Sequence, residues 1–132
     1  MKDLGTALKE RTRANKQKRQ QEIIMTETMT RKKVYVAGPF SGDPEENTSM
    51  AIDYAEAISQ LGYIPYIPHL TLYWDKRHTH EYKFWLDQDI EWLAVCDILF
   101  RMPGKSAGAD DEVAFAKRHN IPVYYNVFDL PH

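Results

Sequence analysis

The chain has a single cysteine, Cys96, among its 132 residues. One thiol cannot form a disulfide framework within the chain, and it cannot supply a four-thiolate zinc site. The sequence also lacks an apolar run near the roughly 20 residues that span a bilayer, and its N-terminus lacks the apolar core of a secretory signal. We therefore expect a cytoplasmic protein that does not engage a membrane.

Motifs that hold metals and common cofactors are also missing. The sequence contains no HExxH pair, no Walker phosphate loop and no GxGxxG fingerprint. His78 and His80 are two residues apart, so their side chains would diverge on a helix, and His69 precedes them in a predicted loop. Cys96 falls near the end of a predicted helix and suits the core. The sequence predicts neither a metal nor a cofactor.

Positive charge is concentrated at the N-terminus. Residues 1–33 hold ten lysines and arginines against four acids, whereas the remainder holds seven against fifteen. Helix-forming residues are common there but apolar ones are few, so we predict a basic arm over residues 1–31, helical or flexible, before a domain over residues 32–132. Nucleic-acid contact would suit the charge, but the arm has no aromatic side chain for base stacking. We favour a solvated helix, an oligomerisation arm or an upstream extension.

Beyond the arm, strand and helix patterns alternate along the chain. Such alternation predicts a small doubly wound α/β domain, Rossmann-like or flavodoxin-like, with four to five parallel strands and helices on both faces. Residues 68–79 are predicted to form a long functional loop. The predicted strands are residues 33–38, 63–67, 97–101 and 120–125, and the predicted helices are residues 44–61, 80–96 and 113–119.

The most informative stretch is RMPGKSAGADDE, residues 101–112. It follows an apolar strand and leads into a helix, so its Gly-containing turn would let a ligand approach the backbone. Glu112 would lie at the start of that helix, at the carboxyl edge of the sheet, where open α/β folds bind ligands. Ser106 and Gly108 would offer a hydroxyl and open amides to a phosphate or a sugar. The alternative is a solvated helix start, since acids are common in first turns.

Two further residues are candidates to share a site with Glu112. Asp89 borders the inward stripe of its predicted helix, while Asp87 and Glu91 point away; a carboxylate at a buried edge is costly unless it is hydrogen-bonded or functional. Tyr35 lies inside the first strand, where a buried hydroxyl needs a partner. Each has a structural alternative: Asp89 could bond a loop backbone, and Tyr35 could be a core residue whose hydroxyl reaches the surface.

These pieces, in this order, resemble the nucleoside 2-deoxyribosyltransferase-like superfamily from about residue 34 to residue 125. The family pattern begins with a strand that ends in Tyr-x-x-Gly, here Tyr35 to Gly38. An Asp follows on a later helix, here Asp89. The last piece is an acid or Ser six residues before a Glu, here Ser106 and Glu112.

Ser rather than an acid at position 106 resembles the deoxynucleoside 5′-monophosphate N-glycosidase branch. The run PGKSAGADDE, with Asn47 early in the first helix, is similar to small uncharacterised phage and bacterial members. In the monophosphate N-glycosidases, the loop after the first strand carries a Ser and an Arg behind its Gly. This chain has Pro39 and Phe40 there, followed by Ser41, so a 5′-phosphate requirement stays open.

The resemblance implies cleavage of an N-glycosidic bond. Glu112 would attack the anomeric carbon and form a glycosyl ester, and its place near a helix N-terminus would keep it ionised. Tyr35 would orient the Glu112 carboxylate, and Asp89 would assist proton transfer to the leaving base. The residues that would bind substrate are Gly38, Pro39, Phe40, Ser41, Asn47, His69, Ser106 and Gly108.

We therefore expect hydrolysis or transfer on a (deoxy)nucleoside or its 5′-monophosphate. In relatives a neighbouring subunit often completes the site, which implies a homo-oligomer, a dimer or higher. Two alternatives stay open. One is a nucleotide-binding module without catalysis. The other is a nucleotide phosphoribohydrolase of related fold, whose usual PGG-x-GT spacing this chain does not match.

Overall fold

The computed structural model describes residues 3–28 and 31–131, and the chain divides into two compact units, residues 1–31 and residues 32–132. In the first unit, α1 (Leu4–Thr28) is one continuous helix whose side chains are exposed from Leu4 to Ile24. Such exposure follows from the lack of an apolar stripe. In the described ranges, no helix has both the length and the hydropathy of a membrane span.

The second unit is built on a four-stranded parallel sheet with the order β2-β1-β3-β4. The chain extends the sheet first on one side of β1 and then on the other, so the carboxyl ends of β1 and β3 form the switch point of a doubly wound fold. The strands are β1 (Lys33–Ala37), β2 (Ile64–Tyr66), β3 (Ile98–Arg101) and β4 (Val123–Tyr124), and the helices of this unit are α2 (Pro44–Gln60), α3 (Leu72–Arg77), α4 (Tyr82–Ala94) and α5 (Ala107–Arg118).

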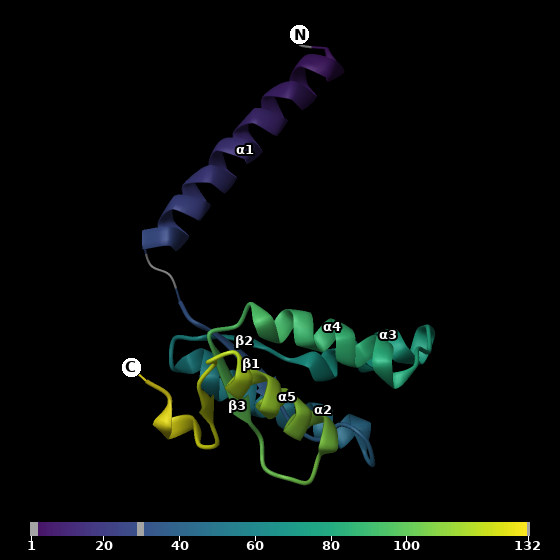
Figure 1. Ribbon diagram of the computed structural model, residues 1–132. Coiled ribbons are helices and arrows are strands. Elements are labelled where there is room, and N and C mark those ends of the chain that lie inside the picture. The colour runs from purple at the N-terminus through teal and green to yellow at the C-terminus, as the bar shows by residue number, and fades with distance from the viewer. Residues whose placement is uncertain (1–2, 29–30, 132) are drawn as a thin grey trace. The chain divides into compact units, whose positions relative to one another are not determined.

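Helices cover both faces of this sheet (Figure 1). α2 packs on the face that carries Val34 and Val36, together with Leu130 near the C-terminus. α4 and α5 pack on the opposite face, which carries Tyr35 and Ala37. Successive residues of a strand point to opposite faces, so Tyr35 points toward the side of α4 and α5. The predicted α/β sheet with helices on both faces is confirmed.

The ends of α2 follow from its sequence. The Asp43 carboxylate accepts a hydrogen bond from the Glu46 amide (3.2 Å), and Pro44 is the first helical residue. Gly62 follows the helix with a φ of 97°, a left-handed conformation that suits glycine. The prediction of a helix over residues 44–61 is therefore confirmed to within one residue.

Residues 68–79 are not the loop that we predicted. Pro68–Thr71 forms the 3-10 helix η1, and α3 follows it directly. Leu72 is buried and anchors the junction, while Lys76 and Arg77 lie in the last turn of α3, where positive charge stabilises a helix. A helix of six residues is too short for its apolar periodicity to stand out in the sequence.

The helix that carries Glu112 starts earlier than predicted, at Ala107 rather than Val113. Ser106 caps it, because its hydroxyl oxygen accepts a hydrogen bond from the Ala109 amide (3.1 Å). A glycine and two aspartates in the first six residues weaken the helical pattern, which explains the missed start. Glu112 therefore lies in the second turn of α5 and not at its N-terminus.

The last strand is also shorter than predicted. β4 spans only Val123–Tyr124 within the predicted residues 120–125. Asn120 has a φ of 58°, which turns the chain sharply after α5, and the chain enters the 3-10 helix η2 (Val127–Asp129) soon after β4. The short strand still pairs in parallel with β3, so the sheet order does not change.

Candidate active site

A pocket of about 330 Å³ lies at the carboxyl ends of β1 and β3, the switch point of the sheet. It is large enough for a small-molecule ligand. Its walls come from the loop after β1, from the η1–α3 segment, from one face of α4 and from the start of α5. The lining residues are Gly38, Pro39, Phe40, Ser41, Pro68, His69, Thr71, Asp75, Tyr82, Trp85, Leu86, Asp89, Lys105, Ser106, Ala107, Gly108, Ala109 and Glu112.

Tyr35 and Glu112 are joined by a buried hydrogen bond, in which the Tyr35 hydroxyl donates to Oε2 of Glu112. Both residues are buried, so the bond ties β1 to the helix that covers it. Burial raises the pKa of the Tyr35 hydroxyl well above its ordinary value, and the negative charges of Glu112 and Asp89 raise it further. The phenol therefore stays protonated and acts as a donor that fixes the orientation of the carboxylate.

The Glu112 and Asp89 carboxyls both hold a proton more tightly than usual. Burial raises the pKa of Asp89 to about 7. Burial likewise raises the pKa of Glu112 to about 7, although the hydrogen bond from Tyr35 opposes the rise. The expectation that a helix N-terminus sets the charge of Glu112 is wrong, because the residue lies one turn further along, and it is the hydrogen bond from Tyr35 that opposes the effect of burial. Near neutral pH the two carboxyls therefore hold about one proton between them in total.

Asp89 lies on the pocket side of α4, whereas Asp87 and Glu91 are exposed, as the helical stripe predicts. Its Oδ1 atom is buried and has no hydrogen-bond partner among the described residues. The alternative that Asp89 bonds a loop backbone therefore does not hold for Oδ1. A buried carboxylate oxygen without a partner is costly unless a ligand satisfies it. Asp89 is therefore poised to contact whatever enters the pocket.

The loop after β1 forms one wall of the pocket through Pro39, Phe40 and Ser41. Asn47 supports this loop from α2. Its side-chain amide donates hydrogen bonds to the carbonyls of Phe40 and Ser41, both at 3.1 Å. Asn47 does not itself line the pocket, so it holds the loop and does not face the ligand space.

His69 supports the same loop from η1. Its Nε2 donates a hydrogen bond to the Pro39 carbonyl (2.9 Å), so this nitrogen carries the proton. Burial lowers the pKa of the imidazole, which keeps the ring neutral at physiological pH. Nδ1 is then a buried acceptor that has no partner in the described part of the chain. The ring lines the pocket, and its edge packs near Phe40.

Glycine is required where the two loops of the site approach each other. A Cβ atom on Gly38 would lie 2.6 Å from Sδ and 2.9 Å from Cβ of Met102. Gly104 has a φ of 112°, and a Cβ atom there would lie 2.8 Å from Cγ of Pro39. The glycines therefore let the loop after β1 pack against the loop after β3.

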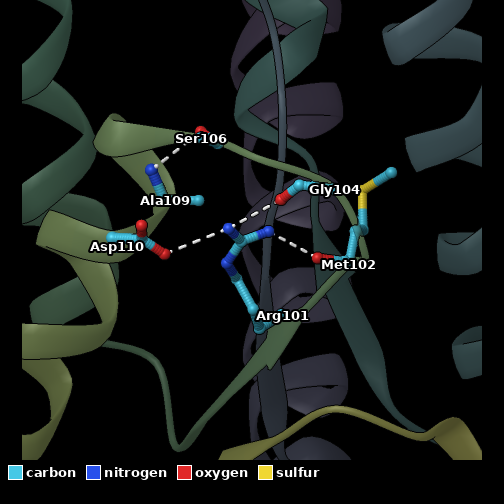
Figure 2. Close-up of polar contacts among 6 residues, drawn as sticks. All are labelled: Arg101, Met102, Gly104, Ser106, Ala109 and Asp110. Carbon is cyan, nitrogen blue, oxygen red and sulfur yellow. Dashed lines mark hydrogen bonds and ion pairs between the residues drawn. The ribbon is translucent and has the colours of Figure 1, made fainter.

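Arg101 organises the turn that leads into α5 (Figure 2). Its guanidinium donates hydrogen bonds to the carbonyls of Met102 and Gly104, and it pairs with Asp110 at 3.1 Å. Ser106 then caps the helix through the Ala109 amide (Figure 2). The Ser106 oxygen accepts that bond, so its hydroxyl hydrogen remains free to donate to a ligand.

Several residues that line the pocket were not predicted from the sequence. Tyr82, Trp85 and Leu86 line the pocket from α4, and with Asp89 they follow the spacing i, i+3, i+4, i+7 of one helical face. Helical spacing counted back from Asp89 toward the N-terminus of α4 could have identified these residues as lying on the same face. Lys105 lines the pocket from the turn before α5; nothing in its spacing identifies it.

Comparisons with known proteins agree with this geometry at the level of the fold. Residues 32–126 match the family described as Domain of unknown function (DUF7768). No curated protein sequence gives a significant match. Among solved structures, the chain is similar to a 2-deoxyribosyltransferase from Bacillus psychrosaccharolyticus, with a TM-score of 0.52 and 20% identity, over 69% of each chain. The nucleoside 2-deoxyribosyltransferase-like fold implied by the sequence resemblance is confirmed.

Proposed function

The chain belongs to the DUF7768 family, and we propose that it cleaves the N-glycosidic bond of a (deoxy)nucleoside or its 5′-monophosphate. The observation that carries this proposal is the buried hydrogen bond from Tyr35 to Glu112, in a pocket that also contains the Asp89 carboxyl. The position of the pocket at the switch point of the sheet supports the proposal. The similarity to a solved 2-deoxyribosyltransferase supports it as well.

In the first step, Glu112 acts as the nucleophile. One carboxylate oxygen attacks the anomeric carbon of the sugar and forms an ester, while the bond from that carbon to the base breaks. The electron pair of the broken bond goes to the base nitrogen, and the protonated Asp89 supplies a proton to the leaving base. The Tyr35 hydroxyl holds the other carboxylate oxygen, so that the attacking oxygen faces the pocket.

In the second step, water attacks the anomeric carbon of the glycosyl ester. The ester bond breaks and Glu112 leaves as a carboxylate, while the ionised Asp89 takes the proton from the water. Free sugar is released and both carboxyls return to their starting states. If a second base attacks in place of water, the same intermediate yields a new nucleoside, which is transfer.

The 5′ end of the sugar is assigned to the start of α5. Ser106 has a free hydroxyl hydrogen, and the loop residues Pro39 and Ser41 line the adjoining wall. Lys105 provides a positive charge on the same side, in place of the Arg that this chain lacks after Gly38. A 5′-phosphate is therefore compatible with the wall, and a 5′-hydroxyl is as well.

The direct test is base release. The full-length protein is incubated with the four deoxynucleosides, the four ribonucleosides and their 5′-monophosphates, and free base is measured by chromatography. The matched variants are Glu112→Gln and Asp111→Asn, because Asp111 is the exposed acid beside Glu112 on α5. We expect base release by the wild type and by Asp111→Asn, and at least a thousandfold less, as an order of magnitude, by Glu112→Gln.

The same experiment separates the alternatives. A nucleotide-binding module would bind members of the panel in calorimetry and release no base. A phosphoribohydrolase would release base from ribonucleotides only. Wild-type release that survives Glu112→Gln would remove the glycosyl-ester mechanism.

A further inference from the structure

Besides the carboxyl pair, the pocket wall carries two chemically different groups of side chains. The start of α5 presents Lys105 and the Ser106 hydroxyl, a cation and a neutral donor. A second part of the wall, from α3 and α4, presents the Asp75 carboxylate and the Trp85 indole, an anion and an aromatic ring. These two groups suit different parts of one ligand.

Asp75 is held in a fixed orientation. Its Oδ1 accepts a hydrogen bond from the indole Nε1 of Trp85 (2.9 Å) and another from the His80 amide (3.1 Å). These bonds lower the pKa of the carboxyl, with the His80 bond contributing most, so Asp75 is ionised at neutral pH. Within the described residues, Asp75 has no ion-pair partner and no hydrogen bond to Oδ2.

The remaining oxygen of Asp75 is therefore a free acceptor on a pocket wall. We propose that Asp75 recognises the base of the substrate by accepting a hydrogen bond from a base N–H, with the base lying against Trp85. The proposal rests on the proposed function, which places the sugar at Glu112 and Asp89. The anionic wall would repel a phosphate, whereas a carboxylate suits the amino and imino groups of nucleobases.

Helical geometry agrees with this placement. Trp85 and Asp89 lie one turn apart on the pocket face of α4, about 6 Å along the helix axis. A sugar held at Asp89 would therefore bring its base alongside Trp85, and the edge of that base would approach the group that fixes the indole, Asp75. Aromatic side chains stack on bases of every kind, so the discrimination is left to the carboxylate.

The test compares Asp75→Asn with the wild type. The Asn oxygen can still accept from Trp85 and His80, so the side chain keeps its orientation, but an NH2 donor replaces Oδ2. The probes are four free bases in two matched sets. Adenine is compared with N6,N6-dimethyladenine, and thymine with 3-methylthymine; in each set methylation removes the N–H donor. Binding of each free base to the full-length protein is measured by calorimetry.

We expect the wild type to bind at least one unmodified base about tenfold or more tightly than its methylated partner, since hydrogen bonds to charged groups are strong. In Asp75→Asn this ratio falls toward one. An unchanged ratio in Asp75→Asn would overturn the inference, because the wild-type preference would then be steric. Absence of base binding, or no preference in the wild type, would overturn it as well.

A second variant separates base recognition from support of the indole. Trp85→Phe removes the hydrogen bond to Asp75 but leaves the carboxylate. If Asp75 only positions Trp85, Asp75→Asn keeps the preference because its oxygen still accepts from the indole, whereas Trp85→Phe loses it, and that result contradicts the inference. We expect the reverse, with the preference lost in Asp75→Asn and mostly kept in Trp85→Phe. Base release by the wild type is measured separately. If the wild type releases base but Asp75→Asn keeps the wild-type binding ratio, this inference alone is wrong. If the wild type releases no base, the proposed function is wrong.

Discussion

The Tyr35 hydroxyl donates a hydrogen bond to Glu112 across the interface between β1 and α5. Neither group is exposed, and no charged partner neutralises the carboxylate by a direct ion pair among the described residues. The pKa of Glu112 consequently depends on a balance. Burial raises it, and the Tyr35 bond is the largest effect that lowers it.

Removal of the Tyr35 hydroxyl should raise the pKa of Glu112 further. In Tyr35→Phe, we expect the acid limb of the kcat/KM profile to move to higher pH, and activity at pH 7 to fall about tenfold or more. Tyr66→Phe is the matched control, because its ring lies 5.7 Å from that of Tyr35 but it makes no hydrogen bond to Glu112. If Tyr35→Phe keeps the wild-type pH profile of kcat/KM, Tyr35 does not orient the Glu112 carboxylate.

The wild-type profile itself should be bell-shaped. Glu112 must be ionised to attack, so activity falls as pH drops below about 7. Asp89 must be protonated to assist the leaving base, so activity also falls as pH rises above about 7. The singly protonated pair is therefore most populated near neutral pH. Initial rates of base release from pH 5 to 9 measure this, and a flat profile would contradict the assignment of both carboxyls.

The same pKa shifts predict a stability effect. The pKa of Asp89 in the folded protein is about 7, above its ordinary value of 3.8, so its favourable contribution to the free energy of unfolding is present at acid pH and is lost as pH rises toward 7. Asp89→Asn should then raise the melting temperature at pH 8 by a few degrees, because about 1 kcal/mol corresponds to roughly 4–8 °C in a domain of this size.

Little change in the melting temperature of Asp89→Asn is expected at pH 4, where the wild-type residue is largely protonated in the folded protein. Glu91→Gln is the control, since Glu91 is an exposed acid on the same helix. Thermal unfolding followed by circular dichroism at the two pH values tests the claim. Equal effects at pH 4 and pH 8 would show that burial of the charge is not the cause.

Much of this arrangement was predictable from the sequence. Tyr35 could be placed in a buried strand because β-branched residues surround it, and Asp89 could be placed on an inward edge because helical spacing fixes its angle relative to Leu86. The position of Glu112 at the carboxyl edge of the sheet followed from the strand before it. These are properties of short segments, which local patterns specify well.

The remaining features depend on contacts between distant segments. Asp75 joins the site only because α3 replaces the predicted loop and lies beside α4, where Trp85 reaches it. The roles of Asn47 and His69 as supports of the loop after β1 depend on where carbonyls of that loop point. The pKa of Glu112 depends on burial, which residue spacing does not determine.

The turn before α5 allows a test of which contacts of Arg101 matter. The Arg101 side chain is 8% exposed and bonds two carbonyls, whereas its partner Asp110 is 71% exposed. We expect Arg101→Met to destabilise the fold by about 2–4 kcal/mol, because the Met102 and Gly104 carbonyls lose their donor. Asp110→Asn should cost less than about 1 kcal/mol. Urea unfolding measures both, and equal losses would assign the stability to the ion pair.

The most direct test of the account is trapping of the glycosyl ester on Glu112. The wild type is denatured with acid during turnover of a substrate that it cleaves in the base-release panel, and the digested peptides are analysed by mass spectrometry. We predict a pentosyl adduct on Glu112 in the wild type and in Asp111→Asn, and none in Glu112→Gln. An active enzyme whose adduct lies on another residue, or a Glu112→Gln variant that still releases base, would contradict the claim that Glu112 is the nucleophile.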